Sequence, residues 1–204
     1  NGTPDPIGRF TSFGPKWAAG TQLYDNLHHF FETGFSQTHN LGLEFGTKNV
    51  AFRASGQYLN NSGVVPNNFY TKYTGRISNT TKIGKYITVT PSVAYSYADN
   101  RKPTKGSSSY LMSLYQWPSN NDIRNYQDDY GGKLTLFNVN PNADFDNPIW
   151  SSKNNITGDI TRRLLSTLGI EIKPFSWLSL AGRFGYDTYK TDGYIQIHPQ
   201  SFYI

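Results

Sequence analysis

The stretch from residue 87 to residue 97 reads ITVTPSVAYSY, and apolar and small polar residues alternate along it. One face carries Ile87, Val89, Val93, Tyr95 and Tyr97, and the other carries Thr88, Thr90, Ser92, Ala94 and Ser96. A period of two is typical of a β-strand, because successive side chains point to opposite sides of a sheet. Pro91 falls among the apolar positions, where it would weaken the central strand of a soluble sheet.

The same alternation recurs on both sides of this stretch. It predicts long antiparallel strands near residues 35–46, 49–60, 69–81, 85–98, 155–172 and 177–190. Turns of a few residues around Thr47, Gly84 and Pro174 join consecutive runs, which is the arrangement of antiparallel hairpins. Arg162 falls on the apolar face of the fifth run and is an exception to the pattern.

The composition is unusual for a soluble domain. Only 36% of the 204 residues are apolar and 16% are charged, whereas 16% are aromatic. No run approaches the roughly 18 consecutive apolar residues of a membrane-spanning helix. Barrel strands keep the mean hydropathy low, because lipid-facing and lumen-facing residues alternate. We therefore expect an all-β, antiparallel transmembrane β-barrel. Cysteine is absent, and the net charge of +5 is spread along the chain, which does not favour nucleic acid as a partner.

The lengths of the connections predict how the chain is organised. Residues 1–34 are expected to be an extracellular loop, 35–98 four strands, 99–154 a long extracellular loop, 155–190 two strands, and 191–204 the start of another loop. The tight turns would then be periplasmic, because barrels have short periplasmic turns and long extracellular loops. About six strands cannot close a useful barrel, so we expect either a fragment of a larger barrel or several chains that pool their strands. The absence of an export signal before Asn1 is interpreted as a missing front end.

Five short motifs follow one another along the chain. They are FGPK at 13–16, Y-x-N at 24–26, FF-x-TG at 30–34, NSGVVPN at 61–67 and NPIW at 147–150, with the strand pair 40–46 and 52–58 between them. In this order they resemble the early barrel of SusC-type (SusC/RagA-like) TonB-dependent outer-membrane transporters.

The resemblance implies a barrel of 22 strands with an N-terminal plug domain. It also implies active import of a glycan or a peptide, a SusD-like surface lipoprotein as partner, and energy supplied by the TonB-ExbB-ExbD complex. The plug and the TonB-box segment have no counterpart in this sequence, so no coupling residue can be assigned.

No motif of an enzyme is found, so we expect no catalytic residue and no cofactor. Tyr110, Tyr115, Trp117 and Asn121 lie in the 99–154 segment, where they are candidates to stack on sugar rings or to hold a peptide backbone. Packing of these rings within the loop is the alternative. On the polar face of the strands, Arg53, Arg76, Arg163 and Arg183 are expected to line the lumen and to favour acidic or peptide-carboxylate substrates.

No metal site is predicted. His28 and His29 are adjacent and would diverge on a strand, and the series Asn142, Asp144, Asp146 fails the pattern of an EF-hand, which leaves an irregular calcium site as an open alternative. Two other functions stay open. One is a soluble sugar-binding or adhesin β-sandwich, which would not need detergent. The other is a channel assembled from several short chains.

Overall fold

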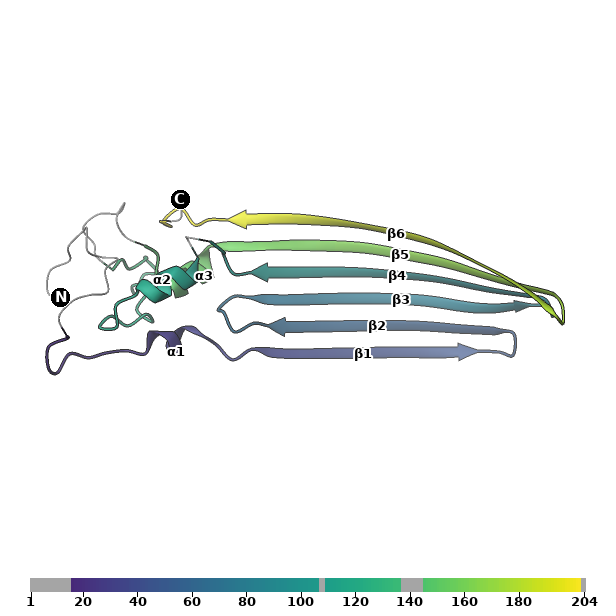
Figure 1. Ribbon diagram of the computed structural model, residues 1–204, viewed down its shortest axis with the longest axis horizontal. Coiled ribbons are helices and arrows are strands. Elements are labelled where there is room, and N and C mark those ends of the chain that lie inside the picture. The colour runs from purple at the N-terminus through teal and green to yellow at the C-terminus, as the bar shows by residue number, and fades with distance from the viewer. Residues whose placement is uncertain (1–15, 107–108, 137–144, 203–204) are drawn as a thin grey trace.

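A computed structural model describes residues 16–106, 109–136 and 145–202. It contains one six-stranded antiparallel sheet in the order β1-β2-β3-β4-β5-β6, so each strand pairs with its neighbour in the sequence (Figure 1). The strands are β1 (Phe35–Gly46), β2 (Val50–Ser62), β3 (Phe69–Ile83), β4 (Ile87–Lys102), β5 (Ile156–Phe175) and β6 (Leu178–Gln196). The predicted all-β fold is confirmed, and β4 and β6 run on past the ends expected from the alternation.

The register places every apolar set on the same side of the sheet. Residues directly opposite one another on neighbouring strands share a face. Leu43 lies opposite Ala54, Ala54 opposite Ile77, and Ile77 opposite Val93. The same side, here called the apolar face, continues across the last two strands through the pairs Pro91–Leu168 and Leu168–Phe184. The opposite side, the polar face, carries the Thr, Ser, Gln and Arg residues that alternate with this set.

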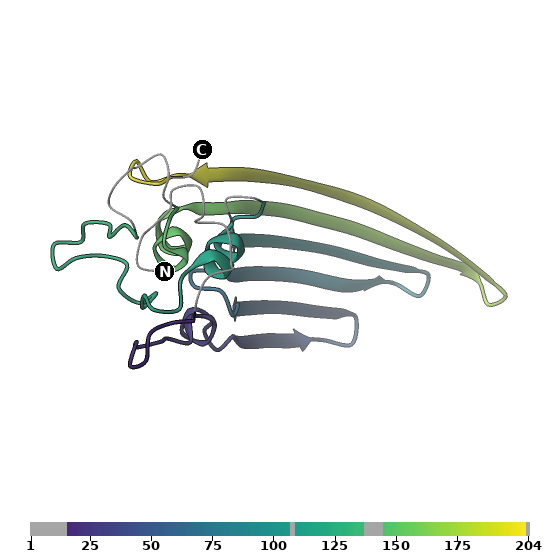
Figure 2. The same ribbon diagram turned by 60° about the vertical axis from the view of Figure 1, so that its left-hand side comes forward.

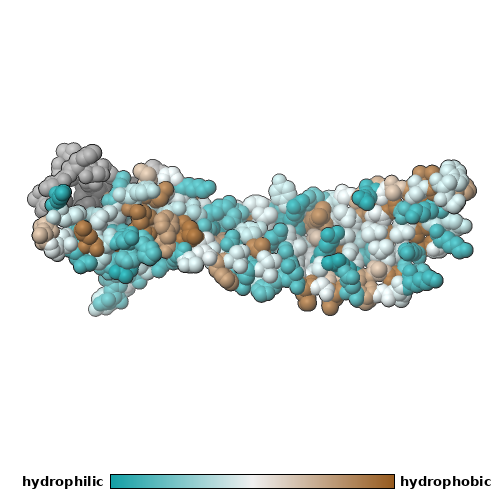
Figure 3. Space-filling view, turned by 60° about the horizontal axis from the view of Figure 1, so that its bottom comes forward, coloured by the Kyte–Doolittle hydropathy of each residue, from teal (hydrophilic) through white to brown (hydrophobic). Residues whose placement is uncertain are grey.

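No second layer covers the apolar face in the described part of the chain. Leu41 is 70% exposed and Phe184 is 67% exposed. Figure 3 likewise shows apolar side chains lying open along the strands between polar ones. A β-sandwich needs a second sheet to bury such a face, and the described residues form a single sheet.

Aromatic rings mark both borders of the apolar face. At one border a single row of residues, called the tyrosine row, crosses all six strands: His39, Tyr58, Tyr73, Tyr97, Arg162 and Lys190. At the other border Phe175 and Trp177 stack with ring centroids 5.6 Å apart. From Arg162 to Ile172 the strand advances about 33 Å, which is about 25 Å along the membrane normal at a tilt of about 40°. That height matches the apolar band of an outer-membrane barrel.

The tight turns and the helices lie at opposite ends of the sheet. The turns after Gly46, Ile83 and Phe175 meet at one end, and α1 (Asn26–Phe30), α2 (Tyr110–Gln116) and α3 (Pro148–Asn154) gather at the other (Figures 1 and 2). The helices and the connections around them, residues 16–34, 63–68, 103–106, 109–136, 145–155 and 197–202, are called the loop module. No helix in the described ranges is long and apolar enough to cross a membrane.

The hydrophobic core lies in the loop module. Its buried apolar members are Phe30, Val65, Leu114, Trp117, Ile123, Ile149 and Trp150. None of them belongs to a strand. The described strands therefore form a wall without a core of its own, and much of the core comes from described residues of the 99–154 segment.

Candidate functional site

Two buried asparagines hold the loop module together. Asn26 in α1 accepts a hydrogen bond from the Ile123 backbone N–H (3.1 Å) and donates through Nδ2 to the carbonyl of Asn121 (2.9 Å). Asn147 caps α3, because its Oδ1 accepts from the Ile149 N–H at 2.8 Å, and its Nδ2 donates to the Ile123 carbonyl at 2.8 Å. The segment around Ile123 is thus fixed between two helices distant in sequence. Both asparagines belong to the motifs Y-x-N and NPIW, which gives those motifs a structural reason.

The predicted aromatic contacts differ in their access to a ligand. Trp117 is 7% exposed and meets Phe145 edge to face, with centroids 5.8 Å apart. Tyr110 is half-buried and stacks on Phe30 at 5.1 Å. Tyr115 is 70% exposed. Of these three rings, only that of Tyr115 stands open for stacking on a sugar or a peptide.

The fourth predicted contact residue of this segment, Asn121, is half-buried in the same module. The backbone carbonyl of Asn121 accepts the hydrogen bond from the Asn26 side chain, so this group is already used within the module. Tyr130, at the tip of the following segment, is 98% exposed. Together with Tyr115 it offers an open ring, so Tyr115 and Tyr130 are the better candidates for ligand contact in this module.

The four predicted arginines all lie on the polar face but in different rows. Arg53 forms an ion pair with Glu44 (2.9 Å), and Arg163 forms a two-pronged pair with Asp187. The Nε of Arg76 donates to the Ser92 hydroxyl at 3.0 Å.

Arg183 makes no ion pair within the described residues, and it lines an open hollow of about 670 Å³ together with Thr90, Thr167 and Glu171. Arg53 on β2 and Arg183 on β6 are four strands apart, which is about 19 Å at the usual spacing. The structure does not gather the arginines into one site, and the attraction of two of them for an anionic substrate is offset by acidic partners.

A buried ion pair lies within the loop module and holds the segment after β6 against the rest of the module. Lys133 pairs with Asp146, and their side chains are 4% and 7% exposed. Asp146 also accepts from the Ser201 hydroxyl and from the Phe202 N–H. Lys133 donates to the Gln200 carbonyl (2.8 Å) and lies 3.4 Å from the centroid of the Phe202 ring. No pattern in the sequence predicts this set of contacts, because its residues are far apart along the chain.

The open calcium alternative gains no support from Asp146, whose oxygens already serve these partners. Asn142 and Asp144 lie outside the described residues. No group of three or more His, Cys, Asp or Glu residues suited to a metal occurs in the part of the chain that the structure describes. His28 and His29 lie in α1 with ring centroids 6.4 Å apart.

One carboxylate of the module has a shifted pKa. The Arg124 guanidinium donates to both oxygens of Asp122, at 2.9 Å through Nε and 2.7 Å through a terminal nitrogen. This hydrogen bonding lowers the pKa of Asp122. The pair stabilises the module above the ordinary carboxyl range near pH 4, and the contribution is lost as the pH falls through the lowered pKa.

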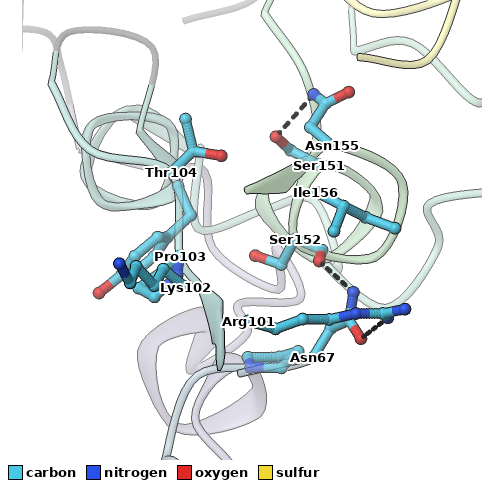
Figure 4. Close-up of a pocket in the computed structure, with 11 residues that line it drawn as sticks. Asn67, Arg101, Lys102, Pro103, Thr104, Ser151, Ser152, Asn155 and Ile156 are labelled. Atoms are coloured by element: carbon cyan, nitrogen blue, oxygen red, sulfur yellow. Dashed lines mark hydrogen bonds between the residues drawn. The ribbon is translucent and has the colours of Figure 1, made fainter. Parts of the chain in front are cut away.

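A small cavity separates α3 from the end of β4 (Figure 4). Asn67, whose φ is 61°, donates to the Ser152 carbonyl at 3.2 Å and accepts from Arg101 at 3.0 Å. The cavity holds about 10 Å³, room for about one water molecule. It is too small to hold a ligand larger than a water molecule.

The fold matches part of the chains of solved transporters. The RagAB peptide importer in the "closed-closed" state matches with a TM-score of 0.68 and 16% identity, over 90% of this chain and 21% of that chain. Its "open-open" state and a further structure of the RagAB peptide transporter each match with a TM-score of 0.64 and 16% identity, over 83% of this chain and 19% of theirs.

At this identity the likeness concerns the fold, which is that of an antiparallel transmembrane β-barrel fragment. The chain spans about a fifth of the length of the structures it matches. No protein-family model and no curated protein sequence matches it.

Proposed function

We propose that this chain forms part of the barrel wall of a SusC-type, TonB-dependent transporter in a bacterial outer membrane. One observation supports the membrane barrel in this proposal. The bare apolar face has the height of a membrane, is bordered by aromatic rings on both sides, and is backed by a polar face. The arginine, threonine and serine side chains of the polar face would stay hydrated in a water-filled lumen. The protein moves a nutrient, and its residues need no catalytic chemistry.

The loop module is proposed as the extracellular side, where substrate and partner meet the barrel. Its packed core gives the exposed rings of Tyr115 and Tyr130 a rigid base. RagAB is described as a peptide importer, and that likeness supports a peptide as substrate, with a glycan as the other candidate. By the resemblance of its motifs to the SusC family, the full transporter works with a SusD-like lipoprotein and with TonB-ExbB-ExbD.

The test uses the full-length parent protein in its own bacterium. Purified in detergent, a barrel migrates differently in gel electrophoresis before and after boiling. An affinity tag on the parent protein should also retain a surface lipoprotein. A strain without the parent gene should take up less of a labelled peptide mixture and the usual amount of labelled oligosaccharides. Reversed substrate losses would make the substrate a glycan, and a parent protein that stays soluble without detergent would disprove the barrel.

A further inference from the structure

Two basic side chains stand on the apolar face at the tyrosine row. Arg162 of β5 lies directly opposite Lys190 of β6, and Tyr97 of β4 lies on the other side of Arg162. Their side chains are 44% and 75% exposed. The Arg162 guanidinium lies 5.7 Å from the centroid of the Tyr97 ring. Both cations therefore face outward, away from the lumen.

The pair stands where the apolar face ends. The rows that begin at Leu41, Leu43 and Phe45, and the two rows beyond them toward the turns, carry no Asp, Glu, Lys or Arg on this face of the described strands. The next row in the opposite direction carries Asp99 and Asp192. A row of tyrosines between an apolar band and charged residues lies at the level of the lipid headgroups, where long basic side chains extend from the apolar band into the polar layer.

One carboxylate holds both cations in place. Asp192 accepts from Arg162 at 2.9 Å with one oxygen and from Lys190 at 2.9 Å with the other. Two positive charges against one negative charge leave the cluster with a net charge of +1. Arginine has five N–H donors and lysine has three, which is more than one carboxylate can accept. A phosphate group, with several anionic oxygens, suits the remaining donors.

We propose that Arg162 and Lys190, positioned by Asp192 and Tyr97, bind a phosphate group of a lipid in the outer leaflet. The lipid's acyl chains would lie along the apolar face below the pair, beside Leu164 and Tyr95, which face each other in the next row. The inference rests on the proposed function, because the orientation of the barrel decides which leaflet this row meets. The occupant is a membrane lipid, since the surface points outward at headgroup level.

The test uses native mass spectrometry of the purified full-length parent protein in detergent. The probes are lipid A with its phosphates and the same lipid with its phosphates removed. Wild-type protein should retain the phosphorylated lipid, and R162Q/K190Q should retain on the order of ten-fold less. The matched control K72Q/K82Q removes two charges from the polar face and should behave as wild type.

Three results would overturn the proposal. They are equal retention by R162Q/K190Q and wild type, equal retention of the two lipids, and loss of the lipid on addition of millimolar inorganic phosphate, which would make free phosphate the ligand. Gel migration before and after boiling separates this from failure of the proposed function. A protein that is no barrel shows no shift, whereas an intact barrel without the lipid site shows the shift and no selective retention.

Discussion

At the scale of single residues, the position of a side chain along the membrane normal explains how a charged residue such as Arg162 can lie on the apolar face. Arg162 breaks the apolar pattern of its strand, yet it lies in the tyrosine row with Asp192 as its partner, so its charge need not enter the apolar band. Trp117 shows the converse. It belongs to a polar, aromatic segment typical of ligand contact, but its ring is buried among Leu114, Ile123 and Phe145 in the loop module. The exposed fraction of each ring therefore separates buried aromatic residues such as Trp117, which pack the module, from exposed ones such as Tyr115 and Tyr130.

The two sets predict different outcomes for two substitutions. Trp117→Ala removes a buried ring and should destabilise the loop module by about 3–5 kcal/mol. Tyr115→Ala removes an exposed ring, so it should leave stability unchanged and weaken uptake of the natural substrate by about 1 kcal/mol in apparent affinity. Limited proteolysis of intact cells measures the first effect, and uptake at equal surface levels measures the second. Normal protease resistance of Trp117→Ala would contradict the packing role, and unchanged uptake by Tyr115→Ala would exclude its ring from binding.

At the scale of elements, a β-strand of this sheet is defined by its two faces. Leu168 on β5 faces the lipid side near the middle of the apolar band, between Pro91 and Phe184. Its neighbour Thr167 faces the polar side, between Ser92 and Gly185. Adjacent positions on one strand therefore meet opposite environments, which allows a matched comparison.

Leu168→Arg should destabilise the folded parent protein in lipid vesicles by about 2–4 kcal/mol, because the charge enters the middle of the bilayer. Thr167→Arg places the same side chain on the polar face and should cost far less. Unfolding by denaturant in vesicles measures both free energies. If the two variants were equally destabilised, the assignment of the faces to lipid and lumen would be wrong.

The strands could be predicted from the sequence because alternation is local, whereas the helices could not. The predicted fourth strand ends at Ala98. Asp99, Asn100 and Arg101 lie beyond the tyrosine row, where neither side of the strand needs apolar residues, so the alternation ends. The hydrogen-bond ladder needs only a neighbouring strand and continues to Lys102.

Helix α3 has seven residues, too few to be stable alone. It forms through contacts such as that of Asn147 with Ile123, 24 residues earlier, which no local pattern reports. Alternation predicts the polar face for the four arginines for the same local reason, whereas the acidic partners of Arg53 and Arg163 lie on neighbouring strands and depend on register.

At the scale of the whole molecule, the described chain is an incomplete wall. Its sheet begins at β1 and ends at β6, and neither strand has a partner on its outer side in the described chain. Unpaired backbone N–H and C=O groups cannot face lipid without a large cost. Further strands must therefore pair with β1 and β6, either from the rest of a longer polypeptide or from other chains.

Orientation in the membrane is the property of the whole molecule that the proposals share. We expect the loop module outside the cell and the tight turns in the periplasm. Tyr130 is 98% exposed at the tip of the module, and Lys85 is exposed in the turn between β3 and β4. Lys85 is a better probe than Gly84, because the φ of 63° at Gly84 would strain a cysteine there.

In the full-length parent protein, Tyr130→Cys should react with a membrane-impermeant maleimide on intact cells, and Lys85→Cys should react only after the outer membrane is opened. Reaction of both in opened cells is the control for access. The chain contains no native cysteine, so within this part of the protein any label reports the introduced site. Labelling of Lys85→Cys but not Tyr130→Cys on intact cells would invert the topology. The exposed tyrosines could then not meet a substrate arriving from outside, and Arg162 and Lys190 would face the inner leaflet.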